Sequence, residues 1–191
     1  MLEIPKLDQA NLERLTTELK VPFRVRFATT GDVAPLLALV NEAYWYENEG
    51  PRAFKKPEAL RVNKDGLRKT VKNGTVLIAA TPEDDKKILG SVEYRETSAS
   101  PGSGSEQAIN AYFAMLAVGE QGKGIGSELV SIVEAVGRFR GRNMMELRFV
   151  NHSNLAGFYR KLGYEVFERQ EHNDPLTLIK PTHFILMRKT L

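Results

Sequence analysis

Cysteine is absent from this chain of 191 residues, and histidine and tryptophan are scarce, with three and one. Without cysteine there can be no disulfide bond, no thiolate metal ligand and no cysteine nucleophile. The three histidines are scattered, and no carboxylates stand near them at a spacing that suits a metal ion. The sequence therefore predicts neither a metal centre nor an acyl-enzyme formed on cysteine.

Long hydrophobic runs and a strong excess of one charge are also missing. No segment is apolar over the length that crosses a bilayer, and the N-terminus lacks an apolar signal region. The 27 basic and 24 acidic residues leave a net charge of only +3, and aromatic residues do not alternate with the basic ones. We therefore expect a cytoplasmic protein with no membrane partner and no nucleic-acid partner.

Hydrophobic periodicity predicts one mixed α/β domain behind a short helix. An amphipathic pattern over residues 7–19 predicts that helix, so residues 1–22 are assigned to an N-terminal helical extension and residues 23–191 to the domain. Strands are expected at 23–27, 75–80, 88–97, 112–118, 144–150, from 166, and at 182–189. Helices are expected from 33 to the aromatic residues 44–46, and at 64–72, 128–136 and 154–162.

A turn rich in glycine stands between the strand that ends near Val118 and the helix that follows. Gly122, Gly124 and Gly126 leave the turn almost free of side chains, and Lys123 adds a positive charge. The unpaired N–H groups and the positive dipole end of a helix that starts here would attract an anion. The turn therefore predicts a site for a phosphorylated ligand.

Spacing excludes two other phosphate motifs at this turn. A P-loop needs Ser or Thr directly after its lysine, but Lys123 is followed by Gly124. A dinucleotide fingerprint that begins at Gly122 needs Gly or Ala at the position of Ser127. A plain surface turn remains the alternative interpretation of the glycines alone.

Two patterns in the C-terminal half resemble signatures of a known superfamily. The pattern Gln/Arg-x-x-Gly-x-Gly/Ala is filled by Gln121, Gly124 and Gly126, and Phe-Tyr-x-x-x-Gly-Phe/Tyr by Phe158, Tyr159, Gly163 and Tyr164. Together with the element order from Phe23 to Leu191, they resemble the GNAT superfamily of acetyl-CoA-dependent N-acetyltransferases. This resemblance implies an α/β (α+β) fold with a mixed, mostly antiparallel seven-stranded sheet, helices on both faces and a V-shaped splay between the fourth and fifth strands.

The resemblance also implies roles for individual residues. Acetyl-CoA would be the cosubstrate, with no metal, and its pyrophosphate would lie on the amides of Gln121, Gly122, Lys123, Gly124, Ile125, Gly126 and Ser127. The backbone of Leu116 would face the thioester carbonyl and Val118 would pair with pantetheine. From the second signature, Tyr159 would protonate the departing thiolate, and Asn154 and Phe158 would contact the coenzyme. The asparagine usual in this segment would fall at His152, between Asn151 and Asn154.

The acceptor side is less determined by the sequence. Tyr44, Tyr46, Glu47 and Glu93 are the candidate substrate residues, although core packing or a solvated surface would explain them equally well. We expect a primary amine, as a small molecule, to attack directly in a ternary complex with a monomeric or homodimeric enzyme. A protein or peptide N-acetyltransferase, and a catalytically inactive coenzyme A sensor or interaction module, are the alternatives.

Overall fold

The computed structural model describes residues 7–46, 62–98, 109–151, 155–172 and 182–191 of the chain. Their helices are α1 (Gln9–Leu19), α2 (Val33–Tyr46), α3 (Lys64–Lys72), α4 (Ile125–Phe139) and α5 (Leu155–Lys161), with a 3₁₀ turn η1 (Thr30–Asp32) before α2. The strands are β1 (Arg24–Phe27), β2 (Val76–Ala80), β3 (Ile88–Ser98), β4 (Ile109–Val118), β5 (Met144–Val150), β6 (Glu165–His172) and β7 (Thr182–Thr190).

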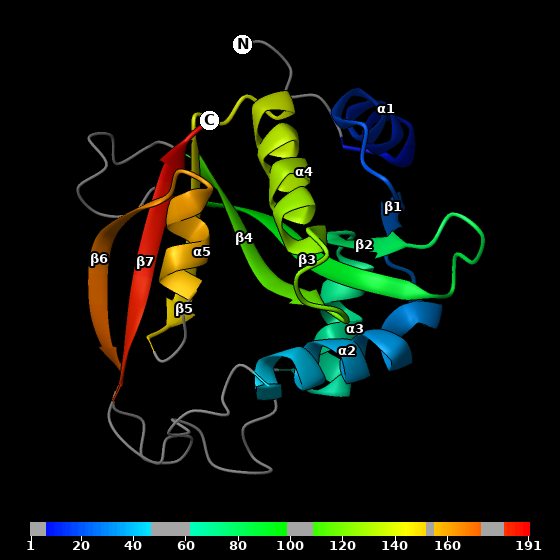
Figure 1. Ribbon diagram of the computed structural model, residues 1–191, viewed down its shortest axis with the longest axis horizontal. Helices are drawn as coiled ribbons and strands as arrows, with labels where there is room; N and C mark the ends of the chain where they lie inside the picture. The colour runs from blue at the N-terminus through cyan, green and yellow to red at the C-terminus, as the bar shows by residue number, and fades with distance from the viewer. Residues whose placement is uncertain (1–6, 47–61, 99–108, 152–154, 173–181) are drawn as a thin grey trace.

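The strands form one seven-stranded sheet in the order β1-β2-β3-β4-β5-β7-β6 (Figure 1). Every neighbouring pair is antiparallel except β4 and β5, which run parallel. The predicted fold class and element order are confirmed. The fourth strand begins earlier than predicted, because Ile109, Asn110 and Ala111 already pair with the end of β3.

Two hydrophobic clusters lie on opposite faces of the sheet. The larger cluster joins α1 and α4 to the sheet and includes Leu12, Leu129 and Phe113. The smaller one joins α2 and α3 to β2 and β4 and includes Leu36 and Leu67. Helix α1 thus packs against α4 and β1, and its leucines belong to the same core as the domain.

The ladder between β4 and β5 is short. Within these two described strands, Ala111 pairs with Met145 and Tyr112 with Glu146, and no later residues pair, although β4 runs on to Val118 and β5 to Val150. The two strands are therefore paired at their beginnings and separate beyond them, as Figure 1 shows. This is the splay expected between the fourth and fifth strands.

A β-bulge interrupts β4 where the strands separate. Ala114 pairs with Glu93 and Ala117 with Ser91, so Met115 and Leu116 share one partner position on β3. Met115 has a φ of 49°, and its side chain packs in the cluster under α2 and α3. Because a bulge leaves its extra residue outside the regular ladder, backbone groups are freed at this point of the strand.

A glycine allows α4 to lie close to the sheet. A Cβ atom on Gly90 would stand 2.9 Å from the carbonyl oxygen of Ala117 and 3.0 Å from a methyl group of Leu129. Backbone cannot yield as easily as the end of a flexible side chain, so no larger residue fits here without movement. Gly90 thereby allows the short distance between the first half of α4 and strands β3 and β4.

The entry to α2 is held by a nearly buried ion pair. Both terminal nitrogens of the Arg26 guanidinium donate to the Asp32 carboxylate at 2.8 Å, and the backbone N–H of Thr29 donates to it at 2.7 Å. The Asp32 side chain is only 10% exposed. Hydrogen bonds from Arg26 outweigh the opposing effect of burial and lower the pKa of Asp32 to about 2.

Candidate functional site

The glycine turn leads directly into α4, as predicted. Gly122 and Gly124 have φ values of 77° and 78°, and Gly124 is the N-cap of the helix. No side chain caps the first turn of α4, and a Cβ atom on either glycine would meet nothing within 4 Å. The helix N-terminus therefore combines uncapped amides with an open surface, which suits an oxyanion.

The first turn of α4 lies beside both neighbouring elements of the predicted site. A Cβ atom on Gly126 would lie 3.7 Å from the ring of Phe158 on α5 and 3.8 Å from a methyl group of Val118 on β4. The two signatures recognised in the sequence, far apart along the chain, thus lie close together. Leu116 and Val118 are half-buried and pack against the larger cluster.

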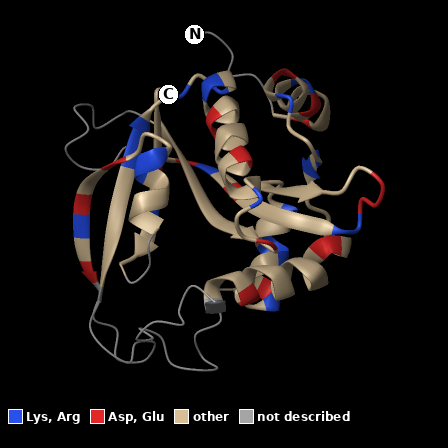
Figure 2. Ribbon diagram, viewed as in Figure 1, with Lys and Arg blue, Asp and Glu red and all other residues tan. Residues whose placement is uncertain are grey.

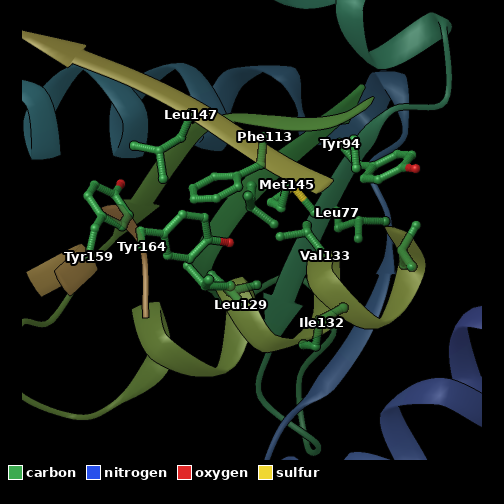
Figure 3. Packing of buried hydrophobic residues seen from close by; sticks show 14 of the residues in the cluster. Leu77, Tyr94, Phe113, Leu129, Ile132, Val133, Met145, Leu147, Tyr159 and Tyr164 are labelled. Carbon is green, nitrogen blue, oxygen red and sulfur yellow. The ribbon is translucent and has the colours of Figure 1, made fainter. Parts of the chain in front are cut away.

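Tyr159 packs against four other aromatic rings, of which Figure 3 labels those of Phe113 and Tyr164. Its ring centroid is 5.9 Å from that of Phe113 on β4 and 5.5 Å from that of Phe149 on β5. The rings of Phe158 and Tyr164 lie 5.0 and 6.0 Å away. Since Tyr159 is 5% exposed, its orientation is set by packing and not by solvent.

Polar side chains are buried on the face of β3, β4 and β5 that points away from α4 and Tyr159. Arg95 binds both carboxylate oxygens of Glu93, which is 2% exposed. Next to them, the side-chain amide of Asn110 donates to Glu146 at 2.7 Å, and Glu146 is paired across the ladder with Tyr112. Glu93 is therefore an ion-pair partner, and it could act as a base only if it left Arg95.

None of Asn110, Tyr112 and Glu146 was predicted from the sequence as a functional residue. They meet at the last rung of the β4–β5 ladder, where the strands begin to separate. The period-two spacing of Asn110 and Tyr112 places both on one face of β4. That spacing was available in the sequence, but their meeting with Glu146 depends on the parallel register of two distant strands.

Several predicted substrate and coenzyme residues are not located by the structure. Glu47 and Asn154 lie outside the described residues. Tyr46 ends α2, but its side chain is also outside the description, whereas Tyr44 is half-buried on the same helix. The acceptor side of the site therefore rests on the residues of β3 to β5 that are described.

Metal binding and membrane insertion find no support in the described ranges. Within them, no three His, Asp or Glu side chains are grouped so that they could hold a metal ion. None of the helices in the same ranges has both the length and the apolar character needed to cross a bilayer. Acidic and basic residues are mixed along α4 and β6 in Figure 2.

The fold is shared with known N-acetyltransferases. Over 88% of this chain and 99% of the other, it superposes on ribosomal-protein-alanine N-acetyltransferase from Brucella melitensis, with a TM-score of 0.61 and 20% identity. The Salmonella typhimurium protein yncA, solved with acetyl-CoA, gives 0.62 and 18% over 90% of this chain and 95% of the other. Drosophila melanogaster polyamine N-acetyltransferase gives 0.62 and 16% over 88% and 100%.

The sequence itself matches one family model. Residues 72–166, about half of the chain, match the acetyltransferase (GNAT) domain. This range contains β2 to α5, and so includes the bulged strand, the glycine turn and Tyr159. No curated protein matches the chain. The chain belongs to the GNAT family of acetyltransferases.

Proposed function

We propose that this protein transfers the acetyl group of acetyl-CoA to a primary amine by direct attack in a ternary complex. The observation that carries the proposal is the uncapped start of α4, which lies beside the end of β4 and the α5 segment bearing Tyr159. An anion-binding turn, a separated strand pair and a buried tyrosine are thereby adjacent within a GNAT domain.

Coenzyme binding is assigned to the turn between Gln121 and Ser127. The backbone amides of this turn would hold the pyrophosphate, with Lys123 and the α4 dipole adding attraction. Val118, together with Phe158 and Asn154, would contact the pantetheine arm. The open space around Gly122 and Gly124 supports this assignment, because a phosphate could approach the backbone without meeting a side chain.

Acyl transfer requires a donor for the carbonyl oxygen, which gains negative charge as the amine attacks. We assign this role to the N–H of Leu116, which lies at the bulge where regular pairing with β3 is interrupted. A well-placed donor of this kind lowers the barrier by about 3 kcal/mol. The side chain of Leu116 packs in the core, so the same residue serves structure and reaction through different atoms.

Proton transfers at the nitrogen and at the sulfur complete the reaction. The amine nitrogen forms a bond to the acetyl carbon, the carbon–sulfur bond breaks, and the sulfur departs with the electron pair. Tyr159 would donate its proton to that sulfur. An alkylammonium has a pKa of about 10.4, so making it neutral at pH 7 costs about 4.6 kcal/mol. A base or water chain on the acceptor side would take this proton and also the second proton that the nitrogen loses when the amide forms, and Glu93 is one candidate. Tyr159 would then regain a proton from water, so that one proton is released in each turnover.

We propose that the acceptor is a small-molecule amine and that Tyr44, Tyr46, Glu47 or Glu93 lines its binding site. Related folds include enzymes for both kinds of acceptor, a polyamine N-acetyltransferase and a ribosomal-protein-alanine N-acetyltransferase. Glu93 would meet a cationic acceptor only if its ion pair with Arg95 opened. The cytoplasmic location and the monomeric or homodimeric state stay predictions.

The test compares aspartate substitutions at two glycines of similar backbone conformation. Gly124→Asp places a carboxylate against the proposed pyrophosphate position. Gly141→Asp places a carboxylate beyond the other end of α4, away from that position. Both glycines have positive φ and open surroundings, so their backbone strain is matched. Calorimetric titration with acetyl-CoA should show binding to Gly141→Asp and to the unchanged protein, and none to Gly124→Asp.

Retained affinity in Gly124→Asp would contradict the coenzyme site. Thiol release over a panel of amines then separates an enzyme from a coenzyme A sensor. Binding of acetyl-CoA without turnover of any amine would favour the sensor.

A further inference from the structure

We infer that Glu134 and Lys189 are positioning residues that orient the proposed acid Tyr159 through Tyr164. The inference rests on the proposed function, because it gives Tyr159 a part in the reaction. It gives a role to Glu134 of α4, Lys189 of β7 and Tyr164 of the α5–β6 turn, although none of them is proposed to touch the reacting atoms.

A buried carboxylate is the centre of this arrangement. Glu134 is 5% exposed, and it accepts a hydrogen bond from the Tyr164 hydroxyl at 2.9 Å. Both of its oxygens also accept from Lys189 Nζ, at 2.9 and 2.8 Å. Arg138 approaches from the solvent side at 3.6 Å, with a side chain that is 50% exposed. The hydroxyl of Tyr164 is thus held in one direction.

Tyr164 is joined to Tyr159 by both its ring and its backbone. The two rings meet edge to face at 6.0 Å, and the Tyr164 ring also meets Phe113 at 5.9 Å. The backbone N–H groups of Leu162 and Tyr164 both donate to the carbonyl oxygen of Tyr159 at 3.0 Å. Any movement of Tyr164 is therefore passed to the end of α5 that carries Tyr159.

Glu134, Lys189 and Tyr164 come from three different parts of the fold. Glu134 lies on α4, whose first turn bears the coenzyme site, and Lys189 lies on β7, where it pairs with Met145 of β5. In Figure 3 the Tyr164 hydroxyl points toward α4, between Phe113 and Leu129 of the core. The bonds to Glu134 therefore set the position of α5 relative to both the glycine turn and the separated strands.

Stability alone is a weak reason for such an ion pair. Burying a carboxylate and an ammonium is costly, and apolar residues of similar volume often serve the fold as well. A hydrogen-bonded charge pair differs from an apolar contact in that it fixes direction. Fixed direction matters for a group that must deliver a proton, because a displacement of about 1 Å can cost up to about 100-fold in rate.

The experiment uses variants that remove the bonds while they retain the packing. Tyr164→Phe keeps the ring but loses the bond to Glu134, and Lys189→Met keeps the stem but loses the ammonium. Each should lower kcat for amine acetylation by about 10-fold, with the KM for acetyl-CoA changed less than twofold. Lys189→Arg, which retains a cationic donor, should restore kcat. Arg138→Gln, which removes only the exposed arm, should leave kcat unchanged.

The outcomes separate this inference from the proposed function. If Tyr159→Phe lowers kcat but Tyr164→Phe does not, the positioning role is overturned and the acid role stands. If Tyr159→Phe has no effect, the acid role fails and this inference fails with it. Circular dichroism melting checks that each variant is folded. If Lys189→Met does not fold, Tyr164→Phe alone decides, because its aromatic packing is unchanged.

Discussion

Replacing Tyr159 by phenylalanine is the sharpest test of the proposed chemistry, because the change removes one oxygen and leaves the ring. That ring packs against four others from β4, β5 and the α5 region. Truncation to alanine would remove these contacts and cost about 3 to 5 kcal/mol. Phenylalanine preserves them, so the free energy of unfolding should fall by no more than about 1 to 2 kcal/mol.

The expected loss of activity follows from the leaving group. A thiol with a pKa of about 8.5 departs as a thiolate unless an acid protonates it. At pH 7, departure as the thiolate instead of the thiol costs about 2 kcal/mol. That energy corresponds to about 30-fold in rate. Tyr159 is 5% exposed, and the low dielectric around it makes an unprotonated thiolate less favourable still. We therefore expect kcat to fall by about 30-fold or more.

The assay is thiol release at saturating acetyl-CoA and amine, combined with calorimetric titration of acetyl-CoA. Tyr159→Phe should bind the coenzyme within about twofold of the unchanged protein, since its ring contacts persist. Tyr94→Phe is the matched control. Tyr94 is also buried, at 7% exposure, and its hydroxyl donates to Glu96 at 3.1 Å, away from the glycine turn. An unchanged kcat in Tyr159→Phe, or an equal loss in Tyr94→Phe, would refute the acid role.

Two further predictions concern the scaffold. The pKa of Asp32 is lowered in the folded state, so its stabilisation is present above the unfolded pKa of about 4 and disappears as the pH falls toward 2. Urea unfolding at pH 7 should show that Asp32→Asn lowers the free energy of unfolding by about 2 kcal/mol, and at pH 3 this difference should shrink by about half. The control Asp65→Asn, at an exposed carboxylate, should change the free energy of unfolding little. A loss in Asp65→Asn equal to that in Asp32→Asn would contradict the reasoning. Gly90→Ala should cost about 1 to 3 kcal/mol in the same assay, because its Cβ would meet Ala117 at 2.9 Å. Gly157→Ala, with open space around it, should not destabilise.

The parts of the site that the sequence predicted are local in the chain. The glycine turn lies between a strand and a helix, and Tyr159 lies within one short signature, so neighbouring residues define both. The strand and helix order followed from periodicity for the same reason. Strand β5 was predicted with its observed ends, Met144 and Val150.

The parts that the sequence did not predict depend on contacts between distant segments. The bulge at Met115 exists only as a shift in register between β4 and β3. The bond from Tyr164 to Glu134 joins residues 30 positions apart, and that from Lys189 joins residues 55 positions apart. Nothing in the local pattern of α4 distinguishes Glu134 from a solvated glutamate until the sheet and α5 cover it.

The bulge in β4 makes one strand serve two different environments. Before it, Ala111 and Phe113 face the core beneath α4, and after it Leu116 and Val118 face the same side. The residues of β4 that face α4 therefore have odd numbers before Met115 and even numbers after it. A deletion of Met115 would restore simple alternation and leave Leu116 and Val118 on the α4 side, but it would remove the bulge and the Met115 contacts beneath α2 and α3. The extra residue therefore changes which backbone groups of β4 are left outside the ladder, while the side chains on either side of it keep their common face.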